Sequence, residues 1–184
     1  LKKSYPFAAA NLRNLVPMGY KCNSQYKNTN DLLYRDDGTR RRSFDPYNHE
    51  TVVISLDNSI PFNGIRGKVQ ETLPKWQIDF SLNSEEIDTW NDVFYIRDRY
   101  SNILNDEFKN WFEFFCQWCK RRINPQSDQE LVDAIKRYAE DRESEGFGER
   151  AFLKTAVFKM LYIHCQNGNQ RLIQFIRYYV ELSI

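Results

Sequence analysis

The stretch FKNWFEFFCQWCKRR, residues 108–122, decides the fold that we expect for this chain. On a helical wheel of about 100° per residue, its apolar side chains fall within about 160° and most charged ones lie opposite. Only Phe114 and Arg122 depart from this division. The pattern predicts an amphipathic core helix that ends near Asn124 and Pro125, because proline disfavours helical geometry in the residue before it. The side chains predicted to face inward are Phe108, Trp111, Phe112, Phe115, Cys116, Trp118, Cys119 and Ile123.

The two cysteines of this stretch have the spacing of a redox or metal-binding pair. A redox pair usually stands at a helix N-terminus, where the helix dipole stabilises the thiolate. Cys116 and Cys119 come late in the helix among aromatic residues, so we interpret them as buried free thiols. A zinc site would need further converging ligands, and adjacent His164 and Cys165 point about 100° apart on a helix. The sequence therefore predicts neither a metal site nor a cofactor.

Helical start signals flank the opening stretch on both sides. Asn83 with Glu86, and Ser127 with Glu130, have the spacing of a capping box. We therefore expect one helix to begin near residue 84 and another near residue 128. Asn105 is a further capping candidate, which predicts that the core helix begins there as a separate element.

Two more helices are expected towards the C-terminus. Residues 150–166 are apolar nearly all round, which is typical of a helix buried among others. Asn167 and Gly168 are a stop signal at its end. The final helix is predicted to bury a stripe made of Leu172, Ile173, Ile176, Tyr179 and Val180.

Strand patterns precede all of these helices. Residues 51–56 (TVVISL) are β-branched and bounded by turn formers, and residues 76–82 (WQIDFSL) alternate apolar with polar side chains. Residues 65–71 could supply a third strand, and Asp37 with Gly38 predicts a hairpin turn. Strands first and helices later favour an α+β fold, with a small antiparallel β portion (31–82) packed on a bundle of about five helices (84–183).

The domain limits follow from composition. Residues 1–30 are polar and interrupted by prolines, which predicts an irregular basic arm ahead of a single domain at 31–184. The chain starts at Leu1 and stops within a helical pattern, so we expect a piece excised from a longer chain. The 184 residues are 41% hydrophobic and 28% charged, as in ordinary globular domains. The many asparagines are typical of AT-rich genomes, including those of viruses.

The cellular location is predicted from what the sequence lacks. No apolar run approaches the roughly 18 residues that span a bilayer, and no secretion signal is recognisable. No asparagine begins an Asn-x-Ser/Thr acceptor, and four cysteines are too few for a disulfide scaffold. We therefore expect an intracellular, cytoplasmic protein whose main partner is not a membrane.

Charge is distributed unevenly along the chain. Residues 1–44 contain nine cations and three carboxylates, a net charge of +6, whereas residues 85–107 contain two cations and seven carboxylates, a net charge of −5. Such asymmetry bears on binding partners rather than on fold. Three consecutive arginines at 40–42 with nearby aromatic rings suit phosphate contacts and base stacking. The candidate binding residues are Arg40, Arg41, Arg42, Lys2, Lys3, Lys21, Lys27, Tyr34 and Phe44.

These residues lead to a main hypothesis and several alternatives. The main hypothesis is a non-enzymatic structural or interaction domain whose basic N-terminal surface binds nucleic acid, an acidic protein or a neighbouring subunit in a homo-oligomer. The basic segment could equally pair with the acidic segment of the same chain and have no partner. A second hypothesis is an enzyme with a site between sheet and helices that uses His49, although no catalytic motif accompanies it. A third is a peripheral membrane module that inserts Phe114 beside Lys120–Arg122.

Overall fold

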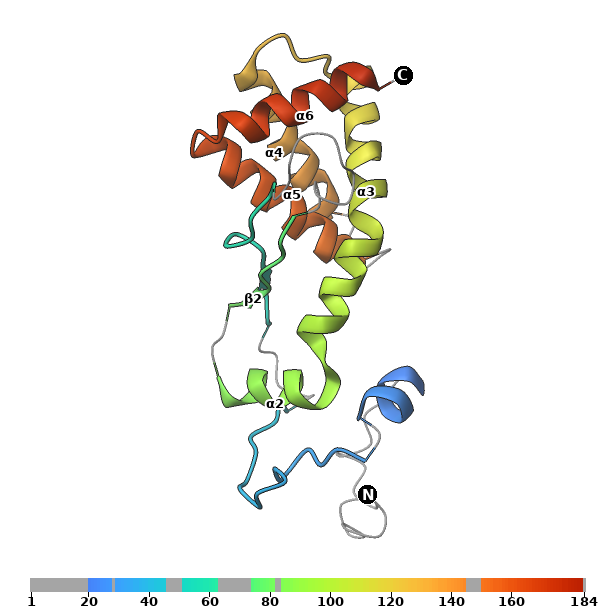
Figure 1. Ribbon diagram of the computed structural model, residues 1–184, viewed down its shortest axis with the longest axis vertical. Coiled ribbons are helices and arrows are strands. Elements are labelled where there is room, and N and C mark those ends of the chain that lie inside the picture. The colour runs from blue at the N-terminus through green and yellow to red at the C-terminus, as the bar shows by residue number, and fades with distance from the viewer. Residues whose placement is uncertain are drawn as a thin grey trace. The chain divides into compact units, whose positions relative to one another are not determined.

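The structure is a computed structural model, which describes residues 20–27, 29–45, 51–62, 74–81, 84–144 and 150–183. These residues are mostly helical, in six helices, with one two-stranded antiparallel sheet, so the predicted α+β class is confirmed in part. Residues 1–51 and 83–96 form one compact unit, and residues 52–82 and 97–184 form a second. The elements in chain order are the π-helix η2 (Lys21–Lys27), β1 (Ile54–Ser55), β2 (Asp79–Phe80), α2 (Glu85–Phe94), α3 (Ile96–Arg122), α4 (Asp128–Ser144), α5 (Ala151–Gln166) and α6 (Gln170–Leu182) (Figure 1).

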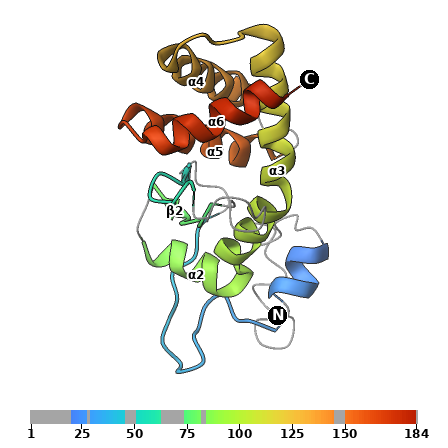
Figure 2. The same ribbon diagram turned by 45° about the horizontal axis from the view of Figure 1, so that its top comes forward.

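The core of the second unit forms around the inner face of α3. Phe115, Cys116 and Cys119 are at most 1% exposed, whereas Phe114 is 64% exposed. This difference between adjacent residues confirms the face predicted from the helical wheel. The ring of Phe115 lies 5.2 Å from those of both Tyr138 on α4 and Phe158 on α5, measured between centroids. The C-terminal half of α3 thus packs beside α4, α5 and α6 (Figure 2).

The two C-terminal helices follow the sequence pattern closely. Helix α5 buries side chains around most of its circumference, as its uniformly apolar sequence predicts. It ends at Gln166, Asn167 is its C-terminal cap, and Gly168 follows with φ of 82°. The side chain of Asn169 then caps α6 by accepting a hydrogen bond from the Leu172 amide at 3.1 Å. The side chains of α6 that are buried are Leu172, Ile173, Ile176 and Val180.

One of the three expected helix starts is absent. The start predicted at Asn105 is wrong, because α3 runs without a break from Ile96 to Arg122. Asn105 instead accepts a hydrogen bond from the Trp76 indole at 2.9 Å. The break in the helical pattern comes at Tyr95, whose left-handed backbone (φ 53°, ψ 42°) separates α2 from α3.

The capping box predicted before α4 is present in a modified form. The hydroxyl of Ser127 accepts a hydrogen bond from the Glu130 amide at 3.2 Å. The Glu130 carboxylate reaches one residue further back and accepts from the Gln126 amide at 2.7 Å. At the start of α2, Asn83 lies outside the described residues, and Ser84 occupies the cap position, but its side chain makes no capping hydrogen bond to the helix backbone.

The sheet is antiparallel as expected, but each of its strands is only two residues long. Ile54 pairs with Phe80 and Ser55 pairs with Asp79. Beyond this short ladder, serine hydroxyls also bond to the backbone. At one end, Ser81 Oγ accepts a hydrogen bond from the Val53 amide at 3.0 Å. At the other end, Ser59 Oγ accepts from the Gln77 amide at 2.9 Å. The third strand predicted at residues 65–71 lies outside the described residues.

Candidate functional site

A hairpin in the first unit contains two of the predicted binding residues. Tyr34 and Arg40 face each other as an antiparallel bridge around the predicted turn at Asp37 and Gly38. Gly38 has φ of 82°, a conformation that glycine adopts without steric cost. The Asp37 carboxylate accepts hydrogen bonds from the Thr39 hydroxyl at 2.6 Å and from its amide at 2.8 Å. These bonds to the charged form lower the pKa of Asp37 and fix the turn.

The two arginines after this hairpin pair with carboxylates of α2 in the same unit. Arg41 Nη1 lies 2.8 Å from Asp92 Oδ2, and its Nε donates to the Tyr34 carbonyl at 3.3 Å. The Arg41 side chain is only 13% exposed, so this pair is partly shielded from water. Arg42 Nε lies 3.4 Å from Glu85 Oε2, in a pair exposed on both sides. The basic and acidic segments therefore meet within one chain at these two arginines.

The first unit as a whole has balanced charge. Its residues, 1–51 and 83–96, include nine cations and nine carboxylates, a net charge of 0. The net charge of +6 on residues 1–44 is therefore balanced by carboxylates elsewhere in the same unit. A surface with balanced charge attracts polyanions less than the linear sequence suggests.

Of the two aromatic candidates, Phe44 is packed against a neighbouring ring and Tyr34 is exposed. The Phe44 ring packs edge-on against Trp90 of α2, with centroids 6.2 Å apart and planes at 87°. Tyr34 is 43% exposed, and Arg40 beside it is exposed as well. Tyr34 and Arg40 thus form an accessible pair within the predicted set.

The four predicted lysines are not gathered at this hairpin. Lys27 is 7% exposed, and its ammonium donates to the Asn30 carbonyl at 3.2 Å. Lys21 is exposed at the start of η2, whereas Lys2 and Lys3 lie outside the described residues. Burial removes Lys27 from any surface that a partner could reach.

The cysteines of the second unit have no features of a reactive or metal-binding site. Cys116, Cys119 and Cys165 are buried free thiols. Burial raises the pKa of all three thiols, to about 11 for Cys119 and to about 12 for Cys165. A raised pKa disfavours the thiolate that nucleophilic attack and metal binding require. Within the residues that the structure describes, no cluster of histidine, cysteine or carboxylate side chains could hold a metal ion.

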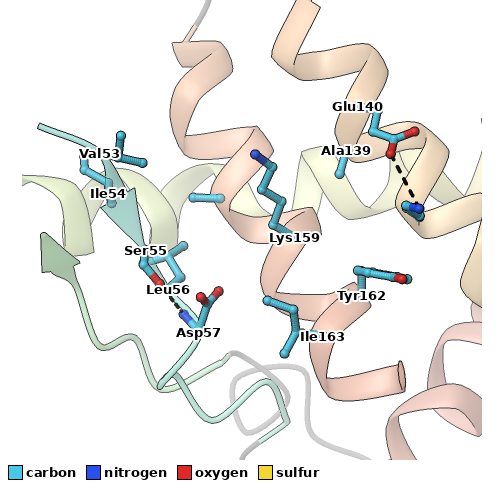
Figure 3. Close-up of a pocket in the computed structure, with 12 residues that line it drawn as sticks. Val53, Ile54, Ser55, Leu56, Asp57, Ala139, Glu140, Lys159, Tyr162 and Ile163 are labelled. Carbon is cyan, nitrogen blue, oxygen red and sulfur yellow. Dashed lines mark hydrogen bonds and ion pairs between the residues drawn. The ribbon is translucent and has the colours of Figure 1, made fainter. Parts of the chain in front are cut away.

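The second unit contains a groove that the sequence did not reveal. Its volume is about 360 Å³. β1 lies on one side, α4 on the other, and α5 between them (Figure 3). Its walls come from residues 53–57, 136–140 and 156–163, which are too far apart in the chain for any local pattern to unite them. Its lining residues are Val53, Ile54, Ser55, Leu56, Asp57, Lys136, Ala139, Glu140, Ala156, Lys159, Tyr162 and Ile163.

The groove lies where the enzyme hypothesis placed a site, between sheet and helices. His49, the residue proposed for catalysis, lies outside the described residues. His164 is not a lining residue, and its Nε2 lies 3.2 Å from the Asp57 carbonyl oxygen. The described lining thus offers carboxylates and lysines but no imidazole, so the catalytic hypothesis stays a prediction.

The remaining observations concern membranes and relatives. Across the segments that the structure describes, no helix combines the length and the apolar character that a bilayer crossing requires. Phe114, Arg121 and Arg122 are exposed on α3, as the membrane-surface alternative requires. No protein-family model, curated protein or solved structure matches the chain.

Proposed function

We propose that this chain is a non-enzymatic interaction domain whose hairpin at residues 34–40 contacts an acidic surface of another protein. The observation that carries the proposal is the pairing of exposed Tyr34 with exposed Arg40 on opposite strands of the hairpin. Tyrosine and arginine are the residue types, together with tryptophan, that dominate binding energy at protein interfaces. An acidic partner surface complements the Arg40 guanidinium.

Hydrogen bonds and an ion pair hold the hairpin in place, which supports this role. The hydrogen bonds between Asp37 and Thr39 hold the turn. The ion pair with Asp92 holds Arg41, the residue directly after the hairpin, against α2. Side chains presented by a preorganised segment lose less conformational entropy on binding than those of a free loop. Arg41 and Arg42 therefore act as supports in this proposal, and Tyr34 and Arg40 act as contacts.

The charge balance favours a protein partner over nucleic acid. Binding to nucleic acid draws most of its affinity from cations that neutralise phosphates. Two of the three arginines at 40–42 pair with Asp92 and Glu85, and the unit formed by residues 1–51 and 83–96 has no net charge. An exposed arginine beside an exposed tyrosine suits a localised contact better than a phosphate track.

The test compares two polyanions of equal length by fluorescence anisotropy, a labelled polyglutamate peptide and a labelled single-stranded RNA. Polyglutamate should bind at low salt, and either Arg40→Ala or Tyr34→Ala should weaken that binding at least fivefold. Arg137→Ala and Tyr178→Ala, which change exposed residues of the same types on α4 and α6, should leave binding unchanged. Light scattering at each concentration reports whether the partner is a second copy of the chain.

Two results would contradict the proposal. Unchanged polyglutamate binding in both hairpin variants would remove the hairpin as the contact element. Tighter binding of the RNA, with log affinity falling linearly with log salt, would identify nucleic acid as the partner instead.

A further inference from the structure

The groove of the second unit has the dimensions of a small-molecule site. Its volume of about 360 Å³ lies within the range of roughly 300–1,000 Å³ that ligand pockets occupy. Ala139 of α4 and Ala156 of α5 both line it, and their small side chains leave space that larger residues would fill. Val53 next to β1 and Ile163 of α5 add aliphatic surface. An apolar ligand body is therefore what these walls would exclude from water most favourably.

Lys159, whose side chain is 47% exposed, is one of the two cations in this lining. Figure 3 shows Lys159 rising from α5 between β1 and α4. Its Nζ donates one hydrogen bond to Glu143 Oε1 at 2.8 Å. An ammonium group has three N–H donors, so two further donors are available to a bound group.

The other charged groups of the lining lie to either side of Lys159. On α4, Lys136 Nζ is 3.9 Å from Glu140 Oε1, an ion pair longer than a hydrogen bond. On the β1 side, Asp57 follows the strand and is exposed to solvent. The lining contains two lysines and two carboxylates, so its net charge does not decide which ligand charge it favours. The positions of these groups in the groove must decide it. The central place belongs to Lys159, and Lys136 is the second cation within the lining.

We infer that this groove binds a small amphipathic organic anion, whose aliphatic or aromatic body lies against Ala139 and Ala156 and whose carboxylate or sulfonate head bonds to Lys159. This site lies in the second unit and is separate from the hairpin of the proposed function. The inference therefore stands whether or not that hairpin binds a protein.

The test uses 8-anilinonaphthalene-1-sulfonate, a dye with an aromatic body and one anionic head that fluoresces in apolar surroundings. The full chain should enhance its fluorescence in a saturable, one-to-one titration. Octanoate should displace the dye, whereas octylammonium, which has the same tail length and the opposite charge, should not. Displacement by octylammonium as effective as by octanoate would overturn the assignment of an anionic ligand.

Substitutions at lining positions test whether the dye binds in the groove or elsewhere on the protein. Lys159→Met keeps an apolar stem and removes the charge, and it should weaken dye binding about tenfold, the effect of losing one charge-assisted hydrogen bond. Val53→Trp adds bulk at a lining position next to β1 that is 58% exposed, so it should weaken binding without unfolding the protein.

The matched control is Lys109→Met. Lys109 is an exposed lysine paired with a glutamate, Glu113 on α3, as Lys159 is paired with Glu143, but it does not line the groove. Its substitution should leave dye affinity within twofold. Dye affinity that is equal in the wild type, Lys159→Met and Val53→Trp would refute the inference, and so would a titration without saturation.

Discussion

The burial of adjacent phenylalanines on α3 gives the sharpest test of the fold. Phe115 is 0% exposed and has aromatic neighbours on α4 and α5, whereas Phe114 is 64% exposed. Phe115→Ala should lower the free energy of unfolding by about 4 kcal/mol, because it removes a buried ring and leaves a cavity. At about 2–4 °C per kcal/mol for a chain of this length, the melting temperature should fall by about 8–16 °C. Phe114→Ala should change the stability by no more than about 0.5 kcal/mol.

Urea denaturation followed by tryptophan fluorescence measures both variants, since Trp118 lies on the same helix and its ring is 6.1 Å from that of Phe115. Where Phe115→Ala fails to fold, Phe115→Leu keeps most of the volume and should cost about 1.5 kcal/mol. Equal destabilisation by changes at positions 114 and 115 would refute the assignment of the inward face. It would also remove the basis for interpreting the cysteines as core residues.

Three further predictions concern other parts of the chain. Burial raises the pKa of Cys119 to about 11 and of Cys165 to about 12 from an ordinary value of 9.0. Between pH 9 and pH 11 the unfolded chain therefore loses thiol protons that the folded chain keeps, so stability should fall by about 1 kcal/mol per thiol from pH 8 to pH 10. Urea midpoints at the two pH values measure this fall, which replacing both cysteines with alanine should reduce. Gly168→Ala should cost about 1 kcal/mol in thermal melts, because φ is 82° and no atom lies within 4 Å of the added Cβ, which leaves backbone strain as the cause. Arg41→Gln should speed amide exchange around the hairpin about fivefold, a loss of about 1 kcal/mol, whereas Arg42→Gln, whose ion pair is exposed, should change it little.

The helical half of the fold could be predicted because its signals are local. The side chains of α3 and α6 repeat at helical intervals, and each apolar stripe proves to be the buried one. The stop at Gly168 and the cap at Asn169 depend on residues within one turn of the helix end. Such features need no knowledge of the tertiary structure, so the sequence is enough to place them.

The errors come from positions where one residue type has more than one use. Asn105 is a good cap by type, yet it stands within α3 and bonds to Trp76, which is 29 positions away. Tyr95 is a poor candidate for a left-handed backbone, yet it separates α2 from α3. A tyrosine in this conformation carries a steric cost that surrounding structure must offset, and no local pattern reveals that.

In the candidate site too, features that depend on adjacent residues could be predicted, and features that depend on distant residues could not. The hairpin could be predicted from Asp37 and Gly38, because a turn depends on adjacent residues. The partners of Arg41 and Arg42 could be predicted only as an alternative, since both lie on a helix more than 40 positions away. The groove could not be predicted at all, because three separate segments form its lining.

Segment charge is therefore a weak guide to the surface of this protein. The positive charge of residues 1–44 and the negative charge of residues 85–107 are both real, but folding brings part of one against part of the other. Arg41 is largely withdrawn from solvent by its pair, so its charge contributes to holding the segment rather than to attracting a partner. Tyr34 and Arg40 are exposed side by side and form the proposed contact, whose specificity must come from shape as much as from charge. A partner selected by net charge alone would respond equally to any exposed arginine, and the comparison of Arg40→Ala with Arg137→Ala separates the two cases.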